Sequence, residues 1–204
     1  MIIDDLISYG KKVKQAGLIT GNSGNISVRL DNNRFAISPS GTRLDELDND
    51  PMAICSLHNE NPLQGRPSIE AGMHRAVYNS RPGVGAILHF QSLYATIVAC
   101  SKETAIDLNF IPEVPACIGT INIVHYFPPG SDELARAVEK AAADPTCYIL
   151  MLKKHGQVAV GKDLDEAMKI AEFCEFACKI FCIGKDLERY TDEELKGLAQ
   201  YRKK

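Results

Sequence analysis

Two histidines each follow an apolar run that predicts a β-strand. His89 comes directly after Ala86-Ile87-Leu88, and His155 follows the run from Tyr148 to Lys154. Strand ends bring side chains from distant parts of a sequence into one crevice, where a neutral imidazole is a good ligand for zinc or a similar divalent ion. A histidine at a strand end can equally be a structural core residue, and residue type alone leaves both readings open. The same holds for His58, His74 and His125.

The seven cysteines form no CxxC pair and are odd in number. Cys174, Cys178 and Cys182 recur at every fourth residue, which is a helical repeat. Because reduced cysteine packs as a small hydrophobic side chain, this stripe predicts a buried helix face in a chain with free thiols. A three-thiolate metal site is the alternative.

Length, composition and charge indicate which classes of protein the chain can belong to. The chain has 204 residues, 45% of them hydrophobic, which is enough for one domain that spans residues 1–204. A net charge of −3 gives no positive field for a phosphate backbone, so nucleic acid is not an expected partner. No apolar run reaches the roughly 18 residues of a membrane span. We therefore expect a soluble, cytoplasmic protein.

Hydrophobic periodicity and turn residues predict the elements that position the histidines. Gly17 ends a first helix, and Ser68 and the Ser131-Asp132-Glu133 pattern each predict a helix start. The predicted helices span residues 2–16, 68–80, 92–100, 131–143 and 164–183, and the predicted strands span residues 26–30, 34–38, 84–89, 121–126, 148–152 and 158–160.

This order of elements predicts an α/β fold of three layers, α-β-α. Strands 26–30 and 34–38 form a hairpin, flanked by two polar loops around residues 20–25 and 38–42. Intervening helices should cover both faces of a central mixed, mostly antiparallel sheet.

Five short motifs, taken in order, give the chain a family resemblance. They are Gly21-Asn22-Ser23-Gly24-Asn25-Ile26-Ser27, Ser38-Pro39-Ser40-Gly41-Thr42, Pro67-Ser68-Ile69-Glu70 with His74, Ala86-Ile87-Leu88-His89, and His155-Gly156 with Gly161-Lys162. From Gly17 to Ala167, about three quarters of the chain, the sequence resembles the class II aldolase/adducin family, including its L-fuculose-phosphate aldolases. Any one motif alone would carry little information.

The resemblance implies a divalent metal. Family sugar-phosphate aldolases bind zinc with a His-x-His pair, a later histidine and a glutamate, which correspond here to His89, His155 and Glu70. Gln91 stands where the second histidine of the pair belongs. The resemblance makes zinc the expected ion. Because the amide oxygen of Gln91 is a weaker donor for zinc than an imidazole, manganese, cobalt or magnesium are alternatives.

The resemblance also implies a reaction. We expect a metal-dependent aldehyde-lyase that cleaves a ketose 1-phosphate of the fuculose or rhamnulose type by retro-aldol chemistry, through an enediolate that the metal stabilises. Glu70 would move the proton. A pentulose-phosphate epimerase and a decarboxylase share this scheme and are alternatives. Gln91 and Ile69 favour a third reading, a non-catalytic adducin-like module.

The family's remaining site residues map onto the polar loops and the carboxyl end. Asn22, Asn25, Ser40, Gly41 and Ser68 correspond to phosphate donors, and Ile69 stands where a second serine is usual. The family takes a tyrosine proton donor from near the carboxyl end of a neighbouring subunit, for which Tyr201 is the candidate and Tyr190 a competitor. The resemblance thus implies a homotetramer with sites between subunits and a small sugar-phosphate substrate.

Overall fold

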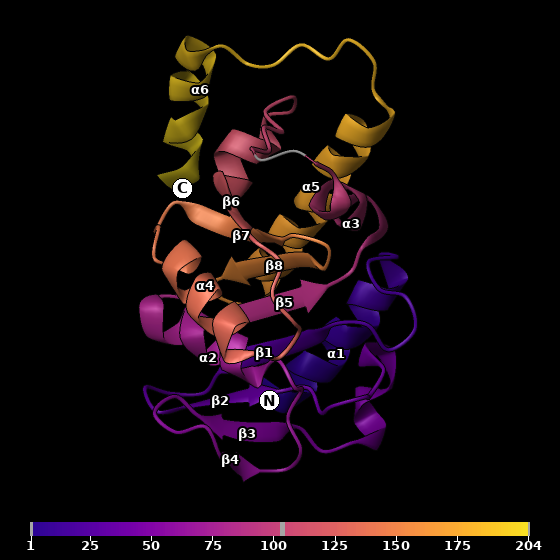
Figure 1. Cartoon of the computed structure of the whole chain (residues 1–204), viewed down its shortest axis with the longest axis vertical. Helices are drawn as coiled ribbons and strands as arrows, with labels where there is room; N and C mark the ends of the chain where they lie inside the picture. Colours follow the sequence, from indigo (N-terminus) through magenta and orange to yellow (C-terminus); the bar gives the residue numbers. More distant parts are fainter. Residues whose placement is uncertain (1, 103–104, 204) are drawn as a thin grey trace.

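The strands of the protein form one open sheet. The computed structural model describes residues 2–102 and 105–203. The sheet has eight strands in the order β4-β3-β2-β1-β5-β8-β7-β6, and neighbouring strands are antiparallel except β6 and β7, which are parallel (Figure 1). The strands are β1 (Asn25–Arg29), β2 (Arg34–Ile37), β3 (Ala53–Ser56), β4 (Pro62–Gln64), β5 (Ala86–Phe90), β6 (Thr120–Val124), β7 (Cys147–Leu152) and β8 (Gly156–Gly161).

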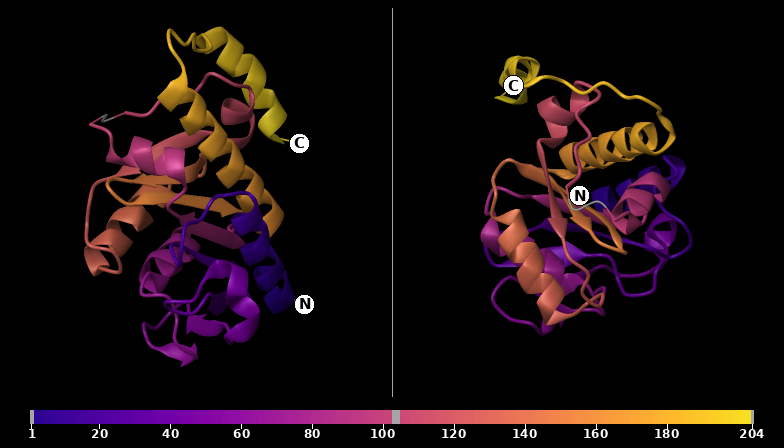
Figure 2. Two further views of the ribbon diagram at one scale, coloured as in Figure 1. Left: turned by 90° about the vertical axis from the view of Figure 1, so that its right-hand side faces the viewer. Right: turned by 45° about the horizontal axis from the view of Figure 1, so that its top comes forward.

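Helices cover both faces of this sheet, as the left view of Figure 2 shows. The α-helices are α1 (Ile2–Gln15), α2 (Ala71–Ser80), α3 (Leu93–Cys100), α4 (Asp132–Ala142), α5 (Leu164–Ile183) and α6 (Asp192–Ala199). Short helical turns form η1 (Leu44–Asn49), η2 (Val114–Ile118) and η3 (Gln200–Lys203). Buried residues of α2 and α4 pack on one face of the sheet, and those of α1, α3 and α5 pack on the other.

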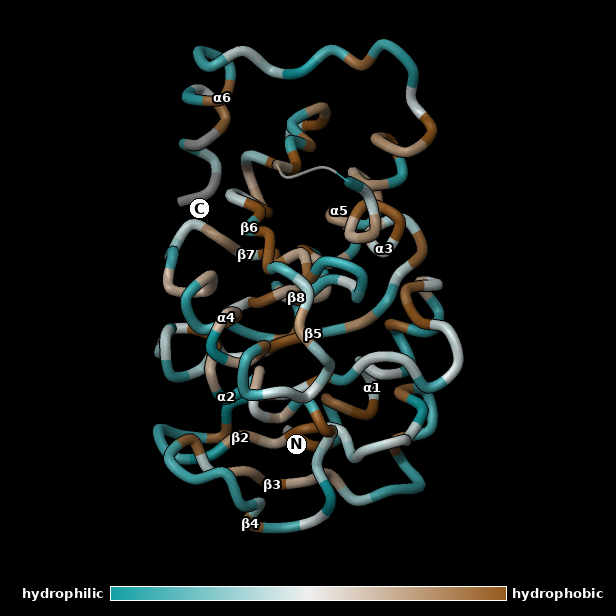
Figure 3. Tube along the Cα trace, in the orientation of Figure 1, coloured by the Kyte–Doolittle hydropathy of each residue, from teal (hydrophilic) through white to brown (hydrophobic). Residues whose placement is uncertain are grey.

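Two separate hydrophobic cores follow from this layering, because side chains alternate between the faces of a strand. In β5, Leu88 and Phe90 face the α1, α3 and α5 side, whereas Ile87 faces the α2 and α4 side. His89 follows this alternation and lies on the same face as Ile87. Hydrophobic residues follow the central strands, while the segment between α5 and α6 is mostly hydrophilic (Figure 3). None of the helices in the described ranges has the length and apolar character needed to cross a membrane.

The predicted fold class is confirmed, and several local signals held. The longest predicted helix has the bounds of α5, Leu164–Ile183. Ser131 caps α4, where its Oγ accepts a hydrogen bond of 3.2 Å from the backbone N–H of Leu134. Cys174 and Cys178 are buried in the core, as the helical stripe predicted, whereas Cys182 is only partly buried. The seven cysteines are free.

Other predictions were wrong in detail. Helix α2 begins at Ala71 rather than Ser68, because Ser68–Glu70 form a turn in which the Ser68 carbonyl accepts from the Ala71 N–H. Strands β3 and β4 were missed, since runs of four and three residues give too little periodicity to recognise. Helix α6 was also missed, although Thr191 and Glu194 form a capping box at its start.

Candidate metal centre

Glu70, His89 and His155 meet in the structure although their positions in the chain are far apart. Glu70 precedes the first turn of α2, His89 is the fourth residue of β5, and His155 lies in the turn between β7 and β8. The His89 Nε2 lies 3.1 Å from Glu70 Oε2, and the His155 Nε2 lies 3.4 Å from Glu70 Oε1. The two Nε2 atoms are 3.3 Å apart. Among the described residues, these three form a group whose donor atoms converge.

These distances fit a small divalent cation. Four ligands at the zinc distance of about 2.0–2.1 Å stand about 3.3 Å from one another around a tetrahedron. The three measured separations, 3.1, 3.4 and 3.3 Å, match the edges of one face of such a tetrahedron. Glu70 Oε1 is buried without a hydrogen-bond partner, so an acceptor there is left for a cation.

The backbone of β8 sets the tautomer of His89. Its Nδ1 lies 2.8 Å from the carbonyl oxygen of Gln157, and because a carbonyl only accepts, Nδ1 carries the hydrogen. In the neutral imidazole the Nε2 lone pair then faces Glu70 and His155. Such a contact to the far nitrogen orients a metal-binding histidine and raises its basicity.

Further hydrogen bonds connect Gln157 to helix α5. The Gln157 Nε2 donates to Ser92 Oγ at 2.7 Å, and Ser92 donates to the Glu175 carboxylate at 2.7 Å. The same carboxylate accepts from the backbone N–H groups of Tyr94 and Ala95, both at 2.8 Å. Glu175 therefore caps α3 and holds the segment that follows β5 in place.

The Gln91 side chain lies beside one of these three donors. Its Nε2 is 3.1 Å from His89 Nε2. The nitrogen and oxygen of an amide exchange positions when χ3 rotates by half a turn, so the amide oxygen reaches the same place. Gln91 is thus placed to supply a fourth, uncharged ligand.

Burial and charge set the protonation states in the centre. Burial raises the pKa of Glu70. The charge and hydrogen bond of a protonated His89, the charge of a protonated His155 and the hydrogen bond from Asn25 outweigh burial and lower that pKa to about 2. Burial lowers the pKa of His155, as does the His89 charge, against the opposing effect of Glu70. An anionic carboxylate and a neutral imidazole are the forms that bind a metal.

A chain of buried polar side chains lies behind Glu70. Asn25 Nδ2 donates to Glu70 Oε2 at 2.9 Å, and Asn25 Oδ1 lies 2.5 Å from His74 Nε2. Ser27 Oγ lies 2.7 Å from His74 Nδ1 and 2.8 Å from the Tyr78 hydroxyl. Sequence reasoning found no role for His74, Ser27 or Tyr78, because nothing in their spacing indicates that they meet.

His74 should make the protein sensitive to acid. Burial, and then the His89 charge, lower its pKa from 6.5 to about 3. Between these values the unfolded chain binds the proton and the folded chain does not, so stability falls as the pH falls. The loss should be about 1 kcal/mol per pH unit.

Urea unfolding of the wild-type protein and of His74→Gln from pH 7 to pH 4 measures this contribution. The pH dependence of the unfolding free energy should be steeper for the wild-type protein. Glu70, whose pKa is lowered from 4.5 to about 2, also makes the unfolding free energy fall as the pH falls. This effect begins only below pH 4.5 and is present in both proteins. Equal slopes for the two proteins above pH 4.5 would contradict the assignment.

Three of the residues predicted to bind phosphate, Ser40, Gly41 and Ser68, lie on two loops that pack side by side. The Ser40 N–H donates to the Arg66 carbonyl at 3.0 Å, and the Ser68 N–H donates to the Ser38 carbonyl at 3.1 Å. A hollow of about 590 Å³ opens beside Ser40 and Gly41, and the guanidinium-bearing residues Arg43 and Arg66 also line it.

Three of the predicted phosphate donors differ in their contacts and exposure. Ser68 Oγ accepts from the Glu70 N–H at 3.3 Å and is mostly buried. Asn25 is 4% exposed, and both ends of its amide are used by Glu70 and His74. Asn22 is exposed in the turn before β1. Within this chain, Asn25 therefore contacts the metal-centre carboxylate rather than the solvent.

The structure does not bring Tyr201 to the centre within one chain. Its turn, η3, packs on η2 and α6, and its side chain is 59% exposed. Tyr190 is tied to the same end of the molecule, where its N–H donates to the Asn109 carbonyl. A catalytic role for Tyr201 stays a prediction and requires a neighbouring subunit.

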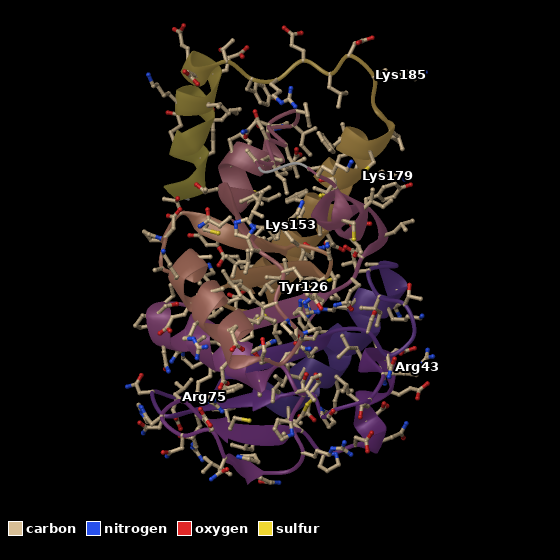
Figure 4. The ribbon with its side chains drawn as sticks, viewed as in Figure 1. Arg43, Arg75, Tyr126, Lys153, Lys179 and Lys185 are labelled. Atoms are coloured by element: carbon tan, nitrogen blue, oxygen red, sulfur yellow. The ribbon has the colours of Figure 1, made fainter. Side chains whose placement is uncertain are left out.

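A tyrosine that sequence reasoning passed over lies beside the His155 turn. Tyr126 follows β6 and is labelled near the middle of Figure 4. Its ring is 53% exposed, and the Lys154 Nζ lies 5.9 Å from the ring centroid. Within the chain, Tyr126 is therefore an exposed tyrosine whose ring lies beside the side chain of Lys154, the residue before His155.

Comparisons with known proteins show the family and the fold of this chain. Residues 4–182 match the Class II Aldolase and Adducin N-terminal domain. A 3-oxo-tetronate 4-phosphate decarboxylase from Haemophilus influenzae is 32% identical over 95% of this chain and 93% of its own length. An L-fuculose phosphate aldolase from Methanococcus maripaludis (strain DSM 14266) is 33% identical over 92% of this chain and 100% of its own. The crystal structure of YgbL from Klebsiella pneumoniae superposes with a TM-score of 0.89 at 30% identity, over 97% of each chain.

Proposed function

Because the chain belongs to the class II aldolase and adducin family, we propose that it is a divalent-metal-dependent carbon–carbon lyase acting on a phosphorylated sugar. Zinc is the expected ion, held by Glu70, His89 and His155 with Gln91 as a fourth donor. The substrate we favour is a ketose 1-phosphate of the fuculose or rhamnulose type. The convergence of three ligand atoms within 4.8 Å of one another is the observation that carries the proposal.

The bound ion would act as a Lewis acid that stabilises negative charge on the substrate oxygens as the carbon–carbon bond breaks. The protein would hold the ion and the substrate in the relative orientation that the reaction needs. Glu70 offers Oε2 toward His89 and Oε1 toward His155, so one carboxylate spans both imidazoles. During cleavage Glu70 would accept the proton of the substrate hydroxyl through one of these oxygens.

The phosphate would lie against the loops that carry Ser40 and Arg66. Ser40 Oγ and the backbone N–H of Gly41 are neutral donors, and Arg66 adds a positive charge beside them. Ile69, which is 67% exposed, offers an apolar surface at a position where the family usually has a serine. Phosphate affinity should therefore depend more on Arg66 than it would with that hydroxyl present.

Decarboxylation of a phosphorylated 3-oxo acid is the second candidate, because a relative named for this activity matches 95% of the chain. Loss of CO₂ from a 3-oxo acid needs a polarised carbonyl but no base to remove a hydroxyl proton, so it makes less demand on Glu70.

Product analysis separates the two. Zinc-loaded protein is incubated with fuculose 1-phosphate, rhamnulose 1-phosphate and a 3-oxo-tetronate 4-phosphate. An aldolase releases dihydroxyacetone phosphate and an aldehyde from the first two, and a decarboxylase releases CO₂ from the third. Turnover that EDTA abolishes and zinc restores supports the proposal. No turnover of any of them, in protein shown to hold zinc, would favour the non-catalytic module.

Replacement of Gln91 by histidine should raise the affinity for zinc. An imidazole is a better zinc ligand than an amide oxygen, and position 91 already faces His89 at 3.1 Å. We expect zinc to bind roughly 10- to 100-fold more tightly, by competition with a fluorescent chelator. Gln91→Leu, which has no donor, is the matched control and should bind zinc more weakly than the wild type. The same dissociation constant in all three proteins would show that residue 91 is not a ligand.

A further inference from the structure

The polar chain behind Glu70 has a hydrogen-bond direction that can be deduced from its donors and acceptors. A carboxylate only accepts, so the Asn25 amide nitrogen donates to Glu70 Oε2, at 2.9 Å. The amide oxygen of Asn25 therefore faces His74, at 2.5 Å from Nε2. An amide oxygen also only accepts, and so His74 Nε2 carries the hydrogen.

The same logic continues to the far end of the chain. His74 is fully buried at 0% exposure, and burial lowers its pKa, which keeps the imidazole neutral with a single N–H. Its Nδ1 then accepts from Ser27 Oγ, at 2.7 Å. Ser27 has used its one hydrogen, so the Tyr78 hydroxyl donates to it at 2.8 Å. Four hydrogen bonds thus run in one direction, from Tyr78 to Glu70.

We propose that His74 is a positioning residue for the metal centre, acting through Asn25 to hold the Glu70 carboxylate in the orientation that serves both His89 and His155. The inference rests on the proposed function in one respect, that Glu70 is a metal ligand. Asn25 is the register partner of His89 across β1 and β5, so its amide is fixed by the sheet, while the amide's orientation is set by His74. Hydrogen bonds that follow one another in one direction polarise and strengthen each other.

Loss of His74 would leave the Asn25 amide free to turn. With its oxygen toward Glu70 Oε2, the contact changes from donation to repulsion between two acceptors. Glu70 would then rotate away from at least one imidazole. An outer contact of this kind typically changes metal affinity by roughly 10- to 100-fold.

Two variants at position 74 and one control separate positioning from packing. His74→Gln keeps an N–H donor close to the place of the imidazole Nε2, whereas His74→Leu has none. Phe35→Leu is the control, since Phe35 packs against the Tyr78 ring at 5.4 Å between centroids on the same face of the sheet, with an apolar side chain. Zinc affinity of the full chain is measured for each by chelator competition. In parallel, long-range ¹H–¹⁵N spectra of the wild type report the His74 tautomer, assigned by the signal that disappears in His74→Gln.

The expected result is an Nε2–H tautomer, zinc affinity 10- to 100-fold weaker in His74→Leu, and affinity within about threefold of the wild type in His74→Gln. Phe35→Leu should unfold at a lower temperature but bind zinc as the wild type does. An Nδ1–H tautomer, or equal losses in Phe35→Leu and His74→Leu, would overturn the inference. If the wild-type protein binds no zinc, the proposed function fails, and the tautomer alone decides the direction of the chain.

Discussion

Replacement of Glu70 by glutamine is expected to lower kcat/KM roughly 1,000-fold and to weaken zinc binding at least tenfold. Glu70 supplies the only negative charge among the three converging ligands, and its two oxygens lie 3.1 Å and 3.4 Å from the two imidazoles. Glutamine keeps the shape but loses the charge, and its amide nitrogen would face a histidine lone pair or the cation. It also removes the base proposed for retro-aldol cleavage.

Steady-state kinetics in a buffer with a fixed free zinc concentration measure this effect. Glu139→Gln makes the same chemical change at an exposed position of α4 and serves as the control. The dependence of kcat/KM on zinc concentration separates the two roles of Glu70. Excess zinc should restore activity lost through weaker metal binding, but not activity lost through the missing base. Activity of Glu70→Gln within tenfold of the wild type would remove Glu70 from both roles.

The second large effect is expected from alanine at Gly24. Gly24 has φ +93°, and a Cβ there would lie 2.6 Å from the carbonyl oxygen of His89 and 2.8 Å from the Cβ of Phe90. Both contacts are too short for any side chain, so β1 and β5 must move apart at the strand that carries His89. We expect the unfolding free energy to fall by about 3 kcal/mol, through the positive φ and the clash together.

Alanine at Gly21 separates the cost of a positive φ from the cost of a steric clash. Gly21 has φ +61° but nothing within 4 Å of an added Cβ, so Gly21→Ala should cost only about 1 kcal/mol. Chemical denaturation gives both values, and zinc affinity should fall in Gly24→Ala but not in Gly21→Ala. Equal losses of stability in the two variants would mean that the close approach of residue 24 to β5 has no energetic weight.

Periodic segments and caps were the part of the fold that could be predicted from sequence. The residues of α5 repeat at helical spacing over Leu164–Ile183, and Ser131 offers a side-chain oxygen where α4 begins. Strand β4, Pro62–Gln64, is three residues long and has only exposed residues, so it shows no alternation of buried and exposed positions. Its position depends on pairing with β3, which local sequence does not encode.

In the candidate site, too, residues marked by local sequence could be predicted, whereas contacts between distant residues could not. His89 and His155 stand out because each adjoins an apolar run, and the family resemblance adds Glu70 and Gln91. Asn25 was predicted to bind phosphate, and its contact with Glu70 could not be predicted because it spans 45 positions of the chain. Gln157 escaped notice for a different reason, because it contacts His89 through its backbone carbonyl, which any residue could supply.

The most direct test of the account is a zinc titration of chelator-treated protein by calorimetry, with the Glu70→Gln, His89→Ala, His155→Ala triple variant beside the wild type. The donor geometry predicts one zinc ion bound per wild-type chain and no binding by the triple variant at the same concentrations. Equal zinc binding by both proteins, or none by a folded wild-type chain, would contradict the claim that these three residues form a metal centre.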